Sequence, residues 1–146
     1  TAQGVLALNI KSDGLLPLIH EFLFELERHD FFFFDMSVPE LLQYSQSGLP
    51  VAVRMSEYET YDLALSQRIG GPLRVWLDAF VHDWFTSSDS VADLLESAFV
   101  VVVSPEIHGR DPRWVWDWVW DRHSDGHTVS ICTDRPLEFM AWGSGH

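Results

Sequence analysis

The segment "FFFFDMSVPELLQYSQSG" (31–48) decides the fold, because it joins one apolar strand directly to one amphipathic helix. Its four phenylalanines form an uninterrupted apolar run, which is typical of a strand buried on both faces of a parallel sheet. Pro39 lies near the start of the helical pattern and Gly48 lies at its end, where these residue types favour the first turn and the termination of a helix. The segment therefore predicts a strand with Asp35 at its carboxyl end, followed by a helix.

The same order of strand and helix recurs along the chain. Six apolar runs have the length of strands, and they cover residues 4–10, 31–34, 50–53, 73–77, 98–103 and 128–132. Four stretches are predicted as helices, and they cover residues 12–30, 38–48, 87–98 and 111–123. Repeated βα units require parallel strands joined by right-handed crossovers. Two architectures fit this order: an open doubly wound sheet, and part of a closed (β/α)8 barrel.

The tryptophan-rich stretch "DPRWVWDWVWDRH" (111–123) is open to two interpretations, since its alternating tryptophans resemble a strand. We predict a helix, because Asp111 and Pro112 form a cap and first-turn signal. Polar residues also recur at every fourth position, which predicts a polar stripe with an i,i+4 ion pair: Arg113, Asp117 and Asp121. The tryptophans could stack against a sugar or a base, but packing against a sheet or a partner is the simpler interpretation.

Composition favours one soluble domain over residues 1–146, because a chain of 146 residues with 47% hydrophobic content can bury one ordinary core. The 22 acidic and 9 basic side chains give a net charge of −13, which disfavours nucleic acid as a partner. Cys132 is the single cysteine, so no internal disulfide is expected and a reducing cytoplasm fits best. No apolar stretch reaches the roughly 18 residues that a membrane span needs, and the first residues lack the pattern of a signal peptide.

A charged or strongly polar group follows each apolar run. In parallel α/β folds the carboxyl ends of the strands share one edge, and ligands bind there. The polar groups at the predicted strand ends are Lys11, Asp13, Asp35, Arg54, Glu57, Asp78, Glu106, His108 and Asp134. Any single one is also explained by helix capping or by a solvated loop, and the regularity of the set is what predicts a substrate-binding edge.

The predicted roles of these residues follow from their chemistry. Lys11 and Arg54 are the natural cations for an anionic substrate, although Lys11 could instead form a structural ion pair with Asp35 or Asp134. His108 could act as an acid or a base, since imidazole titrates near neutrality, and an exposed loop histidine is the simpler alternative. The other histidines lack the spacing of metal ligands, so we predict no metal site from them.

Asp35 raises a further alternative, because it follows an apolar strand like the nucleophile of haloacid-dehalogenase-type phosphatases. Those enzymes carry a second aspartate two positions later, where this sequence has Ser37. The motif is broken, and a polar group at a strand end accounts better for Asp35.

The order of these segments resembles the glycerophosphodiester phosphodiesterase-like barrels, which are similar to phosphatidylinositol phospholipase C, and in particular a divergent bacterial group of them. Two pieces carry the resemblance most specifically: "LNIK" (8–11) is similar to the family's Glu-x-Lys strand, and "TDRP" (133–136) is similar to the Thr-Asp-x-Pro after its last strand. The resemblance covers nearly the whole chain. It implies an incomplete TIM-type barrel of about six of eight strands with the first two missing, and a phosphoric diester hydrolase acting on a small-molecule phosphodiester.

The same resemblance shows what this chain does not match. The family's His-Arg-Gly, Glu-Asn, Glu-x-Asp and second histidine supply its acid, base and metal ligands, and none of them is in this sequence. Asn9 stands where the family has the glutamate before the lysine, and it is a weaker ligand for the calcium or magnesium ion that the family implies. Lys11 matches the family's lysine, which implies a catalytic role in phosphate binding. We therefore expect this chain alone to be inactive on the family's substrates.

A non-catalytic module that binds an anion or a partner chain is the alternative from a different functional class. An open sheet of six strands would leave two exposed edges, which natural proteins pair or cover. This predicts a homo-oligomer.

Overall fold

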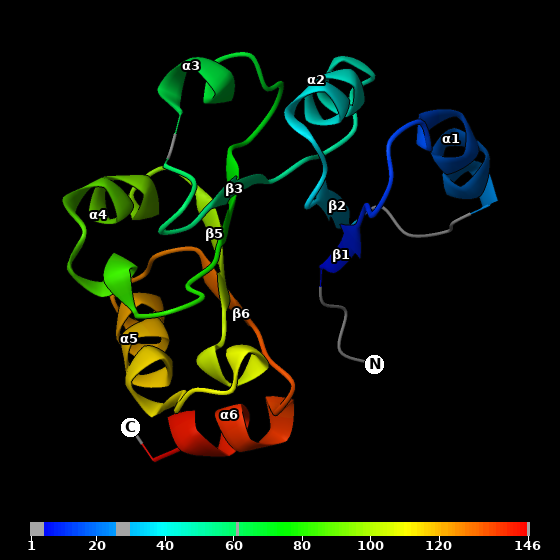
Figure 1. The fold of residues 1–146 in the computed structure, drawn as a ribbon. Helices are drawn as coiled ribbons and strands as arrows, with labels where there is room; N and C mark the ends of the chain where they lie inside the picture. The colour runs from blue at the N-terminus through cyan, green and yellow to red at the C-terminus, as the bar shows by residue number, and fades with distance from the viewer. Residues whose placement is uncertain (1–4, 26–29, 61, 146) are drawn as a thin grey trace. The chain divides into compact units, whose positions relative to one another are not determined.

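The computed structural model describes residues 5–25, 30–60 and 62–145, and it divides into two compact units. The first unit comprises residues Thr1–Val53 and Asp62–Gly71, and the second comprises Arg54–Tyr61 and Pro72–His146. Figure 1 shows strands and helices alternating along the chain. The strands are β1 (Leu6–Asn9), β2 (Phe31–Phe34), β3 (Val53–Met55), β4 (Arg74–Leu77), β5 (Phe99–Val103) and β6 (Val129–Cys132). The α-helices are α1 (Leu16–Glu25), α2 (Val38–Gln46), α3 (Leu63–Ser66), α4 (Asp89–Leu95), α5 (Arg113–Ser124) and α6 (Pro136–Gly143).

The first unit contains a parallel pair of strands. β1 and β2 align from Leu6 opposite Phe31 to Asn9 opposite Phe34. Phe33 at the centre of β2 is fully buried and packs edge to face against Tyr44 of α2, with ring centroids 5.2 Å apart. The phenylalanine run is therefore the buried strand that the sequence predicts.

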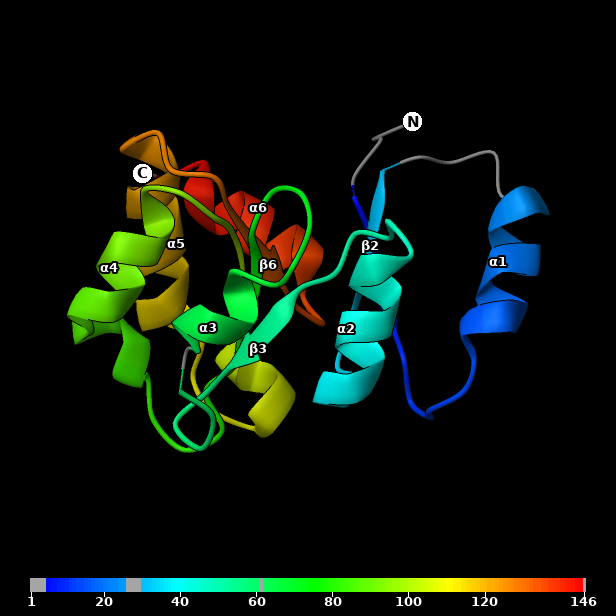
Figure 2. The same cartoon turned by 90° about the horizontal axis from the view of Figure 1, so that it is seen from above.

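The second unit contains a four-stranded sheet in the order β3-β4-β5-β6. β5 pairs in parallel with both of its neighbours, β4 and β6. The views in Figures 1 and 2 agree that α4 and α5 lie together on one side of this sheet. Short 3-10 helices follow β4 and β5, and they cover Trp84–Ser87 and Pro105–His108. The prediction of an α/β protein with parallel strands is confirmed.

The tryptophan-rich stretch is helical, as predicted, and forms α5. Four of its side chains are buried at helical spacing, namely Val115, Trp116, Trp118 and Val119. Of the four alternating tryptophans, Trp116 and Trp118 lie on this buried face, whereas Trp114 is 65% exposed. Two residues of the predicted polar stripe have other partners as well: Arg113 pairs with Asp111, and Asp117 accepts a hydrogen bond from Trp142 at 2.7 Å.

Several elements differ from the predictions. The strand expected at residues 50–53 is displaced to Val53–Met55, because Val51 makes only an isolated bridge to Phe33. The helix expected at residues 12–30 runs over Leu16–Glu25 with Pro17 in its first turn, and the part of that prediction at residues 26–29 lies outside the described residues. The sequence did not predict α3, α6 or the two 3-10 helices. Within the described ranges, none of the helices combines the length and the apolar character that crossing a lipid bilayer requires.

Candidate functional site

Four of the predicted site residues lie at the carboxyl end of the four-stranded sheet. Asp78 follows β4, Glu106 and His108 lie in the 3-10 helix after β5, and Asp134 follows β6. They gather because these strands are adjacent and parallel, so their carboxyl ends lie at one edge. We call these four residues the strand-end cluster.

Asp78 and His108 are in direct contact within this cluster. Oδ1 of Asp78 lies 2.7 Å from Nε2 of His108, and the same oxygen accepts the backbone N–H of Ala79 at 2.8 Å. The Asp78 residue is only 8% exposed, and the backbone carbonyl of Asp78 accepts the indole N–H of Trp84 at 3.0 Å. The carboxylate is thereby fixed in place and orients the imidazole ring.

The second nitrogen of His108, Nδ1, has no hydrogen-bond partner among the residues that the structure describes. The ring packs against Phe80 with centroids 4.9 Å apart, and the histidine side chain is 20% exposed. A carboxylate on one ring nitrogen fixes which nitrogen carries the proton and leaves the other to exchange a proton with a ligand. This arrangement is suited to acid or base chemistry.

Glu106 has a different position, since both of its carboxylate oxygens are occupied. Oε2 accepts from the hydroxyl of Ser104, while Oε1 accepts from the hydroxyl of Thr133 and the backbone N–H of Asp134. Burial raises the pKa of Glu106, but these hydrogen bonds outweigh it, so the pKa lies below its ordinary value. Glu106 therefore ties the end of β5 to the end of β6 as a carboxylate.

The charges of the same cluster affect the thiol of Cys132 at the end of β6. Burial raises the pKa of its thiol, and the negative charges of Asp134, Asp78 and Glu106 raise it further. The thiol is thus held in its protonated form and is a poor candidate for a nucleophile.

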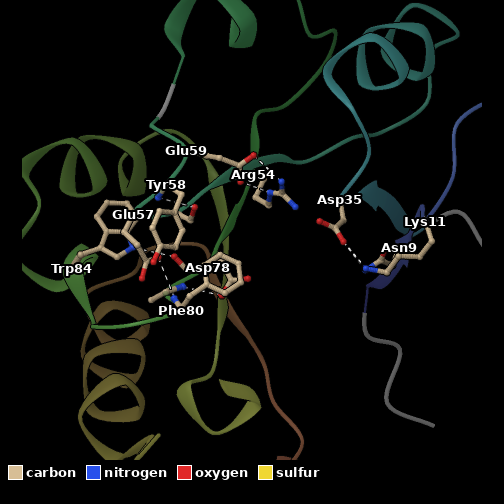
Figure 3. A network of polar contacts seen from close by, with 12 residues as sticks. Asn9, Lys11, Asp35, Arg54, Glu57, Tyr58, Glu59, Asp78, Phe80 and Trp84 are labelled. Atoms are coloured by element: carbon tan, nitrogen blue, oxygen red, sulfur yellow. Dashed lines mark hydrogen bonds and ion pairs between the residues drawn. The ribbon is translucent and has the colours of Figure 1, made fainter. Parts of the chain in front are cut away.

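The loop after β4 is held by two groups from other elements, as Figure 3 shows in part. Glu57 accepts the backbone N–H groups of Phe80 and Val81, at 3.1 and 2.7 Å. Burial raises the pKa of Glu57, but these hydrogen bonds lower it more. Arg110 donates to the carboxylate of Asp83 at 2.6 Å and to the carbonyl of Ala79. Sequence reasoning missed Arg110, although its place two residues after His108 was a signal.

Both predicted anion-binding cations have carboxylate partners. Arg54 of β3 makes a two-point contact with Glu59, through Nε and through the terminal nitrogen at 2.7 Å (Figure 3). In the first unit, Nζ of Lys11 lies 2.6 Å from Oδ2 of Asp35. The structural ion pair that the sequence left open for Lys11 is therefore formed with Asp35. The Lys11 side chain remains 74% exposed.

Asp35 also shows why the first unit does not fit a divalent cation. The amide of Asn9 donates to Oδ2 of Asp35 at 3.3 Å, so this oxygen already has an ammonium and an amide as neighbours. Among the described residues, no group of three or more His, Cys, Asp or Glu side chains could hold a metal ion. The residues that the structure describes therefore do not assemble the calcium or magnesium site that the resemblance implies.

The structure thus assembles an oriented imidazole and a set of hydrogen-bonded carboxylates in the second unit, and an exposed lysine in the first. The strand-end cluster can move a proton, and Lys11 and Arg54 can contact an anion if their ion pairs open. Comparison with protein-family models, with curated proteins and with solved structures finds no match for this chain.

Proposed function

We propose that this chain functions as a phosphoric diester hydrolase of the glycerophosphodiester phosphodiesterase-like type, with His108 as its acid–base group. We also propose that the six strands of the chain belong to a TIM-type (β/α) barrel. Three observations support it: the parallel βα order, the polar groups at the strand ends, and the motifs at residues 8–11 and 133–136. The contact between Asp78 and His108 carries the proposal, because it supplies a group able to activate water.

The chemistry needs one proton transfer at the attacking group. Neutral His108 accepts a proton from water as the water oxygen attacks phosphorus, and Asp78 stabilises the imidazolium that forms. The ester P–O bond breaks, so the products are a phosphomonoester and an alcohol or alkoxide that takes up a proton. Arg54, which lies in the same unit as His108, would offset the negative charge of the phosphate once its partly exposed ion pair with Glu59 opens.

The choice of substrate makes the proposal testable on this chain. Bis(4-nitrophenyl) phosphate has a leaving group that departs without being protonated, so a base alone is enough to accelerate its hydrolysis. Glycerophosphocholine needs protonation of a poor leaving group, and no residue here matches the two histidines of the family. We expect slow hydrolysis of the activated diester and none of glycerophosphocholine.

Replacing His108 by asparagine is expected to lower kcat/KM for bis(4-nitrophenyl) phosphate by about a hundredfold, the usual contribution of general acid–base catalysis. Asp78→Asn should lower it less, because the imidazole remains. The control is His123→Asn, since His123 is an exposed histidine of α5 that belongs to no strand end. Release of 4-nitrophenolate measures the rate, and circular dichroism checks that each variant is folded. An unchanged rate in His108→Asn would exclude this role.

A non-catalytic anion-binding module is the second candidate. It is favoured by the 74% exposed side chain of Lys11, and by the described residues forming no group of three or more His, Cys, Asp or Glu that could hold a divalent cation. Saturable binding of glycerophosphocholine without hydrolysis of either diester would support this candidate over the first. Hydrolysis of 4-nitrophenyl phosphate that is lost in Asp35→Asn would instead support the phosphatase alternative.

A further inference from the structure

A groove of about 800 Å³ lies in the second unit where α5 and α6 begin. Its lining includes three arginines, Arg110, Arg113 and Arg135, and the side chains of Trp116 and Trp142. Neither Asp78 nor His108 lines it, so it is separate from the strand-end cluster. We propose that this groove binds a phosphate ester, with the arginines on the phosphate and the tryptophan wall on the apolar part of the ester.

The charge of the groove is unusual for this protein. The lining holds three arginines and two carboxylates, Asp111 and Glu138, which leaves a formal surplus of one positive charge. The whole chain carries 22 acidic and 9 basic residues. A third of those basic residues therefore meet in one groove, which makes it a local attraction for anions against the field of the whole chain.

The three arginines differ in how firmly they are held. Arg110 is fixed by Asp83 and by the carbonyl of Ala79, and its Nε is buried with no hydrogen-bond partner among the described residues. Arg113 and Arg135 are 66% and 51% exposed. The groove thus combines one preorganised guanidinium with two that can turn toward a ligand, and the planar guanidinium group matches phosphate in two-point contacts.

The existing ion pairs of the exposed arginines do not oppose this binding strongly. Arg135 lies 3.7 Å from Glu138, and their side chains are 51% and 66% exposed. Arg113 contacts Asp111, which is 56% exposed. Solvent screens an exposed pair such as Arg135–Glu138, so a phosphate dianion can displace the carboxylate of Glu138 from Arg135. The backbone N–H groups in the first turns of α5 and α6 add to the attraction.

The tryptophans define the rest of the ligand. The indole N–H of Trp116 donates to Ser104 at 2.8 Å, and that of Trp142 donates to Asp117 at 2.7 Å. Their polar atoms are therefore engaged inside the protein, and the partly exposed ring of Trp142 presents carbon to the groove beside the nearly buried ring of Trp116. A ligand with an apolar or aromatic group next to its phosphate would bury that group here, whereas inorganic phosphate would not.

The test is isothermal titration calorimetry of the whole chain, once with phenyl phosphate and once with inorganic phosphate. We expect phenyl phosphate to bind more tightly, and its affinity to fall with added salt. Arg135→Gln should weaken it by roughly tenfold, the loss expected for one charge-assisted contact. The matched control is Arg122→Gln, because Arg122 makes the same i,i+3 type of ion pair, with Asp125 at 3.3 Å, outside the groove.

The outcomes separate this inference from the proposed function. Binding that persists in His108→Asn and weakens in Arg135→Gln supports the groove whether or not the chain hydrolyses a diester. Equal affinity for phenyl phosphate and inorganic phosphate would show that the tryptophans do not contribute to binding. Equal weakening in Arg135→Gln and Arg122→Gln, or no binding of phenyl phosphate at millimolar concentration, would overturn the inference.

Discussion

Glu106 stabilises the fold as a charged residue although it is partly buried. Its two oxygens accept hydrogen bonds from Ser104, Thr133 and Asp134, which belong to the ends of two strands. Hydrogen bonds to a charged acceptor contribute more than neutral ones, so this carboxylate contributes to the free energy of unfolding.

The pH dependence of stability should report this residue. Because the pKa of Glu106 is lower in the folded chain than its ordinary value of 4.5, its contribution is complete above that pH and is lost as the pH falls below it toward the folded pKa. We expect Glu106→Gln to lower the free energy of unfolding at pH 7 by about 1–2 kcal/mol. The difference from the parent chain should shrink below about pH 4.5. Urea denaturation at both pH values measures it, and an equal difference at both would contradict the assignment.

At the residue scale, the sequence identified the strand-end residues but not their partners. Asp78 and His108 are both polar groups after apolar runs, and that pattern is local. Their contact spans 30 positions and depends on the alignment of β4 with β5, which no local pattern encodes. The same holds for Arg110, whose partner Asp83 lies in a different loop.

At the scale of elements, α5 and α6 pack closely against each other. Trp120 of α5 stacks on Phe139 of α6, with ring centroids 5.0 Å apart and an angle of 18° between the rings. A methyl group added at Gly143 would overlap the ring of Trp120. This glycine is required for the close approach of the two helices.

Gly143→Ala should therefore destabilise the chain by about 1–3 kcal/mol, the usual cost of overpacking. Gly145→Ala is the control, because a methyl group there would meet its nearest neighbour at an ordinary 3.5 Å. Thermal unfolding followed by circular dichroism compares the two variants. If both variants melt at the same temperature, the packing of α6 on Trp120 is looser than described.

The strands and helices show which sequence patterns predict secondary structure. Continuous β-branched or aromatic runs predicted the strands, because strands buried on both faces need no polar alternation. α6 was missed because it lacks an alternating polar face: Leu137 and Met140 are 84% and 58% exposed, so apolar residues lie on both its inner and outer sides. β3 was displaced because its pairing continues past the apolar run into Arg54.

At the scale of the whole molecule, the α/β class with parallel strands was predictable, since the class follows from the order of the elements. The closed barrel remains a proposal that depends on the resemblance. The expectation of one domain also remains a prediction, and the described chain forms two compact units.

The edges of the sheets predict self-association. β6 is the last strand in the order of the four-stranded sheet, and Ser130 on it is exposed. An uncovered edge strand can pair with a second copy of the chain. We expect sedimentation velocity to show a dimeric fraction that increases with protein concentration. Ser130→Lys should lower this fraction. Ser90→Lys, on an exposed face of α4, should leave it unchanged. A strictly monomeric parent chain would contradict this prediction.

The division into two units also has a genetic consequence. The chain passes from one unit to the other at residues 53–54, 61–62 and 71–72. Neither unit is therefore encoded by one continuous stretch of gene, and a single recombination event cannot transfer either of them to another protein.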